Sequence, residues 1–70
     1  MKGFIKVEGY VYESLPIRTE LINIQYIVKV FTSSKNNKAF ITIYDPRGFQ
    51  GLQTLKTIEE IEKMIQEAMI

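Results

Sequence analysis

The sequence predicts an α+β fold, in which a small antiparallel sheet of three or four strands carries one C-terminal helix packed on one face. Residues 4–13 alternate between two kinds of side chain with the period of two that a strand requires. Two further runs rich in β-branched and aromatic residues, 27–33 and 39–45, flank a polar tip. Residues 57–70 carry apolar side chains three and four positions apart, which is typical of an amphipathic helix.

The first strand is expected over "FIKVEGYVYE", residues 4–13. Its two sides hold different residues, with Ile5, Val7, Gly9 and Val11 on one and Lys6, Glu8, Tyr10 and Tyr12 on the other. Gly9 indicates a bulge or a bend. Pro16 ends the strand, since the residue before a proline is biased to an extended conformation that leads into a turn.

The next stretch, "ELINIQYIVKVFTSS", admits two interpretations. A single strand over 21–32 fits it in part. The interpretation that we favour is a turn of helix at 23–26, followed by a strand at 27–33. Asn23 can cap such a turn, and Ile24 and Ile27 then lie three apart on one face.

A hairpin should follow, because the polar tip "SSKNNK" contains two asparagines that tolerate left-handed backbone angles. The strand after the tip is expected over 39–45. Next, "DPRG" has Asp45 first, Pro46 second and Gly48 fourth, which is the pattern of a type I turn. A fourth short strand at 49–55 is weakened by Gly51.

The C-terminal helix is expected from residue 58 to about residue 68. Thr57 and Glu60 form the T-x-x-E pattern of a capping box. The helix carries an apolar stripe with Met64 beside it, composed of Ile58, Ile61, Ile65, Ala68 and Met69. The predicted core of the whole chain comprises Ile5, Val7, Ile24, Ile27, Val28, Val30, Ile41, Ile43, Leu55, Ile58, Ile61 and Ile65.

Length and composition narrow the classes of function. Seventy residues are the length of one domain, residues 1–70, and a domain this small often needs a partner chain to be stable. The chain has no cysteine and no histidine, which removes thiolate zinc sites and the commonest general base. We therefore expect no enzyme activity, no catalytic residues, no metal site and no cofactor.

Charge is unevenly distributed along the chain. Residues 21–58 hold five basic residues and one acidic residue, a net of +4, whereas residues 59–70 hold one basic and four acidic residues, a net of −3. A basic segment over 29–56 can meet a phosphate backbone, with candidate contacts Lys29, Lys38, Arg47 and Lys56. The alternative function is therefore nucleic-acid binding, in a phage or other mobile-element context.

No apolar run is long enough to span a membrane, so a cytoplasmic location is expected.

Self-association has the stronger physical basis. One helix can cover only one face of a small sheet, so large residues on the other face need cover or form an exposed patch. A second copy or a protein partner could supply that cover. The expected function is a non-catalytic accessory or adaptor module that acts by self-association or protein binding. Its candidate contacts are Arg47, Phe49, Tyr44, Phe40 and Tyr12.

Three stretches, "LINIQYIVKVF", "AFITIYD" and "LKTIEEIEKMI", resemble the small flagellar proteins of the FlbD type, which are related to the swarming-motility protein SwrD. The likeness covers roughly residues 20–65. Asn23, Ile24 and Ile27 match the family's Asn-led turn, and the helix opening is matched by Thr57, Glu59, Glu60 and Ile61. The resemblance implies a small β-rich sheet closed by a C-terminal helix, with no catalytic residues to carry over.

Overall fold

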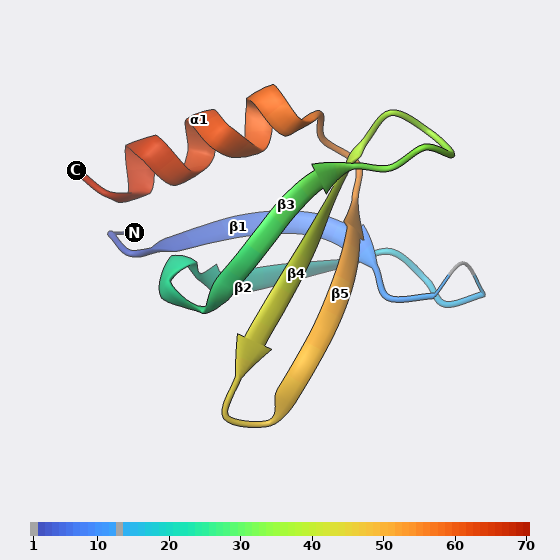
Figure 1. Cartoon of the computed structure of the whole chain (residues 1–70), viewed down its shortest axis with the longest axis horizontal. Coiled ribbons are helices and arrows are strands. Elements are labelled where there is room, and N and C mark those ends of the chain that lie inside the picture. The colour runs from blue at the N-terminus through green and yellow to red at the C-terminus, as the bar shows by residue number, and fades with distance from the viewer. Residues whose placement is uncertain (1, 13) are drawn as a thin grey trace.

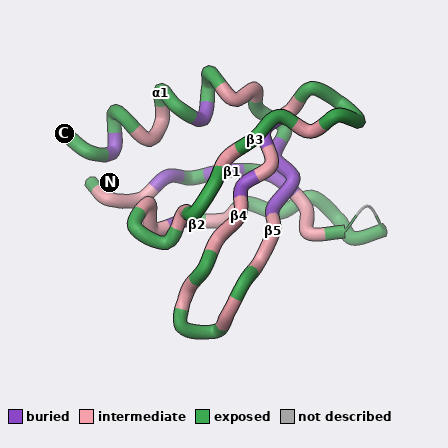
Figure 2. Tube along the Cα trace, viewed as in Figure 1, coloured by how far each residue is buried: buried purple, intermediate pink, exposed green. Residues whose placement is uncertain are grey.

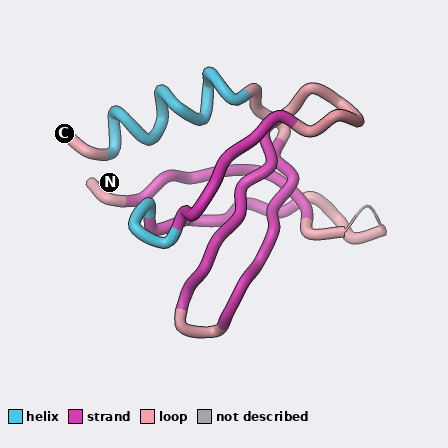
Figure 3. The backbone as a smooth tube through the Cα atoms, viewed as in Figure 1, coloured by secondary structure: helices cyan, strands magenta, loops and turns pink. Residues whose placement is uncertain are grey.

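The computed structural model describes residues 2–12 and 14–70 and shows a five-stranded antiparallel sheet with one C-terminal helix (Figure 1). The order of strands across the sheet is β2-β1-β5-β4-β3. The elements follow one another as β1 (Phe4–Tyr10), β2 (Arg18–Asn23), the 3₁₀ turn η1 (Ile24–Tyr26), β3 (Ile27–Thr32), β4 (Ala39–Asp45), β5 (Gly48–Thr54) and α1 (Ile58–Ala68) (Figure 3).

The expected α+β class is confirmed, but the expected count of three or four strands is wrong. The additional strand is β2, which pairs with β1 from Phe4↔Asn23 to Gly9↔Arg18. Of its residues that lie opposite the buried side of β1, only Ile22 is buried, while Arg18 and Glu20 form an ion pair. The apolar alternation that identifies a strand is therefore almost absent from β2.

The sheet consists of two leaves that diverge from one corner. Between β1 and β5 only two residue pairs are formed, Gly9↔Thr54 and Tyr10↔Gln53. The leaf β1–β2 and the leaf β3–β4–β5 separate beyond that corner (Figure 1). The two edge strands, β2 and β3, are consecutive in the chain and joined by η1, so the sheet rolls up. Helix α1 contacts β1, β3 and β4 and so covers residues from both leaves.

The close approach of β5 to β1 at this corner explains why residue 9 is a glycine. A Cβ atom at this position would lie 2.3 Å from the backbone oxygen of Gln53, much closer than atoms can approach. Pairing between β1 and β2 runs unbroken through Gly9, so the glycine serves this close approach of β5 and does not mark a bulge in that pairing. Strand β1 itself is shorter than the expected 4–13. It ends at Tyr10, and Glu13 lies outside the described residues.

The turns follow their local sequence. The backbone N–H of Gln25 donates to Asn23 Oδ1 at 2.9 Å, which confirms the expected cap and the turn at 23–26. At the β3–β4 tip, Asn37 adopts a φ of 60°, as expected of an asparagine in a reversal. At the β4–β5 hairpin, the N–H of Arg47 donates to Asp45 Oδ1 at 2.9 Å, and Gly48 takes a φ of 114° that favours glycine.

The core lies between the two leaves and the helix (Figure 2). Its buried apolar residues are Ile5, Val7, Ile22, Ala39, Ile41, Leu52, Ile61 and Ala68. Partly buried residues pack against them, namely Ile24, Ile27, Val30, Ile43, Ile58, Met64 and Ile65. Ten of the twelve predicted core residues are thus in one of the two groups. Ile22, Ala39 and Leu52 belong to the core although the sequence pattern did not indicate them.

Two predicted core residues, Val28 and Leu55, are instead exposed. Pairing between β3 and β4 shifts register between Ile27 and Lys29, so Val28 is the extra residue of a β-bulge and leaves the core alternation. Leu55 lies just beyond the end of β5 at Thr54, in the bend that leads to α1, so it does not continue the strand into the core. The bulge accounts for Val28, and the end of β5 accounts for Leu55.

Helix α1 begins as predicted, with both hydrogen bonds of the capping box. The N–H of Glu60 donates to Thr57 Oγ1 at 3.2 Å, and the N–H of Thr57 donates to Glu60 Oε1 at 2.9 Å. Met69, expected in the apolar stripe, is exposed because the helix ends at Ala68. Among the described helices, none is long and apolar enough to cross a membrane.

Candidate functional site

Four aromatic side chains lie on the side of the β3–β4–β5 leaf that faces away from the core. In β4 the buried Ile41 alternates with outward-facing residues, and the paired strands follow the same alternation. Tyr44 and Phe49 keep 55% and 69% of their surfaces exposed. We call this surface the aromatic face and define it by Phe31, Phe40, Tyr44 and Phe49.

The aromatic face is organised as two cross-strand pairs. Phe31 and Phe40 are register partners whose ring centroids lie 5.2 Å apart with the rings tilted by 31°. Tyr44 and Phe49 are register partners 4.6 Å apart in an edge-to-face arrangement at 70°. Both distances are in the range that aromatic pairs prefer. The pairs thus order the exposed rings without burying them.

Gly51 belongs to the same surface. A Cβ atom on Gly51 would lie 2.5 Å from Cζ of Phe40, so the Phe40 ring occupies the space that a side chain would fill. The expected fourth strand through this glycine is present as β5. Because the ring covers the bare backbone, Gly51 weakens the strand less than its lack of a side chain suggests.

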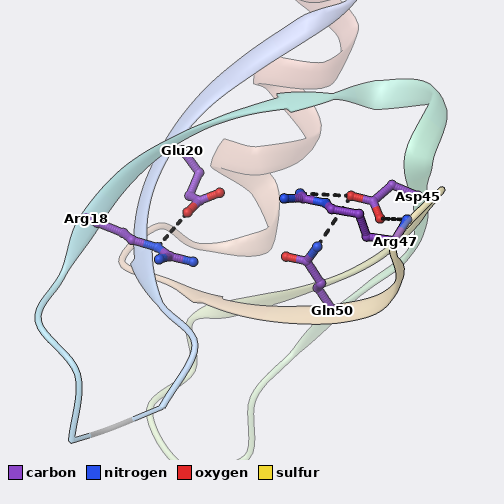
Figure 4. A network of polar contacts seen from close by, with 5 residues as sticks. All are labelled: Arg18, Glu20, Asp45, Arg47 and Gln50. Carbon is purple, nitrogen blue, oxygen red and sulfur yellow. Dashed lines mark hydrogen bonds and ion pairs between the residues drawn. The ribbon is translucent and has the colours of Figure 1, made fainter.

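The β4–β5 hairpin holds a small polar network (Figure 4). Asp45 and Gln50 alternate with Tyr44 and Phe49 along the two strands, so the network lies on the face opposite to the Tyr44–Phe49 pair. Asp45 Oδ2 accepts from Arg47 Nη2 at 3.2 Å and from Gln50 Nε2 at 3.4 Å. Desolvation raises the pKa of Asp45, but the hydrogen bonds from Arg47 and its positive charge outweigh it, so the pKa lies below the ordinary value. The ionised carboxylate therefore holds the guanidinium at the hairpin, where most of the Arg47 side chain stays exposed.

A cleft of about 420 Å³ lies at the opposite end of the aromatic face. The Phe31–Phe40 pair lines one part of it, and Tyr10 and Tyr12 line another. The polar tip 33–36 lines a third part. We call this hollow the tip cleft, and it is bounded by residues of both leaves of the sheet.

The predicted partner-binding residues separate into two groups. Tyr44, Arg47 and Phe49 all belong to the β4–β5 hairpin, where Tyr44 and Phe49 pair with each other and Arg47 forms an ion pair with Asp45. Phe40 and Tyr12 both line the tip cleft instead. Sequence reasoning did not single out Phe31, although its alternation with Val30 and its position across the hairpin from Phe40 could have indicated it.

The four predicted nucleic-acid contacts do not share one surface. The Nζ of Lys29 lies 5.4 Å from the centroid of the Phe31 ring, on the aromatic face. Arg47 is engaged with Asp45 at the hairpin. The positive charges of Lys38 and Lys56 instead lie near the carboxylate of Glu60, at the start of α1.

The pKa of Glu60 is lowered by its hydrogen bonds in the helix cap and by these two lysines. Hydrogen bonds with the backbone and side chain of Thr57 lower this pKa, and desolvation raises it less. The positive charges of Lys56 and Lys38 lower it further. These two lysines are therefore near the protein's own carboxylate.

Among residues 2–12 and 14–70, no three acidic side chains gather in a way that could hold a metal ion. Comparisons with protein-family models, curated protein sequences and solved structures give no match for this chain, so the resemblance to the flagellar proteins stays a prediction.

Proposed function

We propose that the protein is a non-catalytic accessory module that self-associates through the β4–β5 hairpin. The contact surface would be the hairpin end, defined by Tyr44, Arg47 and Phe49. The observation that carries the proposal is the exposure of the Tyr44–Phe49 pair, since 69% of the Phe49 surface remains open in the single chain. Clustered exposed aromatic rings are typical of surfaces that bind another protein.

The hairpin end has the chemistry of an interface anchor. Aromatic residues and arginine are the types most often found at the energetic centre of protein interfaces. Asp45 already orders the Arg47 guanidinium, so less side-chain freedom is lost when a partner binds. The projecting hairpin can meet the same hairpin of a second copy around a two-fold axis, which is the commonest form of self-association.

The required area is modest for a chain of this size. A stable interface of standard size buries about 800 Å² on each partner. The chain exposes 5045 Å² in total, so such a dimer would cover roughly a sixth of it. Burying exposed apolar surface would also add stability to a domain whose core is small.

The lowered carboxylate pKa values fit a non-catalytic role. Asp45 and Glu60 both have a pKa below the ordinary value, and each carboxylate is used in a turn or cap. A general acid or base at neutral pH would need its pKa shifted upward. Neither of these two carboxylates therefore has the raised pKa of a general acid or base at neutral pH.

Light scattering over a series of concentrations tests the proposal. The wild-type mass should rise above 8.2 kDa with concentration, and Phe49→Ser should keep the mass of one chain. Leu21→Ser is the matched control, since Leu21 is also an exposed apolar strand residue but lies on β2. A wild-type mass that stays at that of one chain, or an equal effect of both variants, would refute self-association through the hairpin end.

A further inference from the structure

The tip cleft has a different composition from the hairpin end. Four aromatic side chains line it, two of them from β1 and the residues after it and two from β3 and β4. Its volume of about 420 Å³ lies within the range of small-ligand sites, about 300–1,000 Å³. Tyr12 is 67% exposed, so one ring stands open to a ligand.

Positive and polar groups surround these rings. Lys29 lies over the Phe31 ring, and Lys35 is among the residues that line the cleft. Ser33, Ser34 and Asn36 add hydroxyl and amide groups. The four acidic residues after position 58 all lie on α1, and none of them lines the cleft. A negatively charged ligand with flat aromatic groups complements this arrangement.

We propose that the tip cleft binds single-stranded nucleic acid. Bases would stack on Tyr12 and on the Phe31–Phe40 pair, and phosphates would approach Lys29 and the polar tip. Stacking on aromatic side chains with cations along the backbone is the usual chemistry of single-strand recognition, and it tolerates many base sequences. A duplex keeps its bases stacked inside, so it cannot use the rings of the cleft in this way.

Fluorescence polarisation with labelled single strands of about 12 nucleotides tests the proposal, since single-strand sites span about 4–16 nucleotides. Poly-dT and poly-rU strands should bind, and a hairpin duplex of the same composition should bind more weakly. Affinity should fall steeply between about 50 and 200 mM salt, because phosphate contacts release counterions. The proposal would be overturned if single strands did not bind, if their binding did not depend on salt, or if the duplex bound equally well. Binding of peptides but not of nucleic acid in the cleft would also overturn it.

Matched variants locate the site. Tyr12→Ala should weaken binding about tenfold by removing one stacking surface. Tyr26→Ala is its control, because Tyr26 is also exposed but does not line the cleft. Lys29→Gln should reduce the slope of log K against log salt by about 0.7, the value for one phosphate contact on a single strand. Lys63→Gln, on α1, removes the same charge elsewhere and should leave the slope unchanged.

A second cleft variant distinguishes loss of binding from loss of the fold. Ser34→Glu places a negative charge on an exposed loop residue of the cleft, so the fold should persist, as checked by circular dichroism, while binding is lost. If Ser34→Glu and Tyr12→Ala both bind like wild type, the cleft is not the site. The hairpin-end variant Phe49→Ser changes neither ring nor charge of the cleft, so self-association and nucleic-acid binding can fail separately.

Discussion

Two glycines of β1 and β5 occupy positions where a side chain would collide with another part of the sheet. At Gly9 the obstacle is the backbone oxygen of Gln53, at 2.3 Å from the position of a Cβ atom. At Gly51 the obstacle is the far end of the Phe40 ring, at 2.5 Å. A backbone atom fixed in a strand pair cannot move aside, whereas the Phe40 side chain can swing about its Cα–Cβ bond.

This difference predicts unequal costs for the same substitution. Gly9→Ala should lower the free energy of unfolding by about 3 kcal/mol, and Gly51→Ala by about 1 kcal/mol, within the usual range for overpacking. Urea unfolding of the two variants measures both values. An equal or reversed order would show that the β1–β5 corner is looser than the structure indicates.

The aromatic residues of the hairpin should contribute little to the stability of the single chain. Phe49→Ala leaves the core intact and removes one exposed edge-to-face contact, so its cost should be below about 1 kcal/mol. Ile61→Ala removes a fully buried side chain and should cost about 2–5 kcal/mol. Thermal unfolding at a concentration that favours single chains compares them. If Phe49→Ala lowered the stability as much as Ile61→Ala does, Phe49 would have to pack inward.

At the scale of elements, the start of α1 depends on a reciprocal pair of hydrogen bonds between Thr57 and Glu60. Thr57→Ala removes the acceptor for the Glu60 N–H and should lower the free energy of unfolding by about 1 kcal/mol. Ser34→Ala, in an exposed loop, is the control for loss of a hydroxyl group. Chemical denaturation measures both, and a cost for Thr57→Ala no larger than that of the control would count against the cap.

Acid should weaken both the helix cap and the hairpin. The pKa values of Glu60 and Asp45 are lowered in the folded chain, so the unfolded chain binds protons more readily. Their contribution to stability is full above the unfolded values, about 4.3 for glutamate and 3.9 for aspartate, and is lost as pH falls through the lower folded values.

The melting temperature against pH tests this titration. Glu60→Gln keeps an acceptor for the Thr57 N–H but cannot titrate, so its melting temperature should fall less steeply in acid than that of the wild type. Glu62→Gln, on the same helix but outside the capping box, is the control. Identical acid profiles for wild type and Glu60→Gln would contradict the role assigned to the cap.

At the scale of the whole molecule, strong local signals predicted most of the elements. The capping box and apolar stripe fixed α1 to within a residue of its ends, and the Asn23 cap located η1. Strand β2 lacked such a signal, because Arg18 and Glu20 occupy positions that a core strand would fill with apolar residues. Its assignment depends on pairing with β1, which a single sequence does not show.

The candidate site was predictable in its residue types but not in its layout. Alternation predicted aromatic residues on the second sheet face, and Tyr44 and Phe49 form a cross-strand pair there. The separation of Phe40 and Tyr12 into the tip cleft required the rolled sheet, which brings the end of β1 beside the β3–β4 tip. Long-range arrangement, rather than local propensity, decided which aromatic residues are neighbours.

Nuclear Overhauser contacts between isotope-labelled and unlabelled copies in one sample would show directly whether the β4–β5 hairpins of two chains meet, because only contacts between chains are recorded. Such contacts are expected at the rings of Tyr44 and Phe49. Intermolecular contacts confined to α1 or to the β1–β2 leaf would contradict it, as would their complete absence at millimolar concentration.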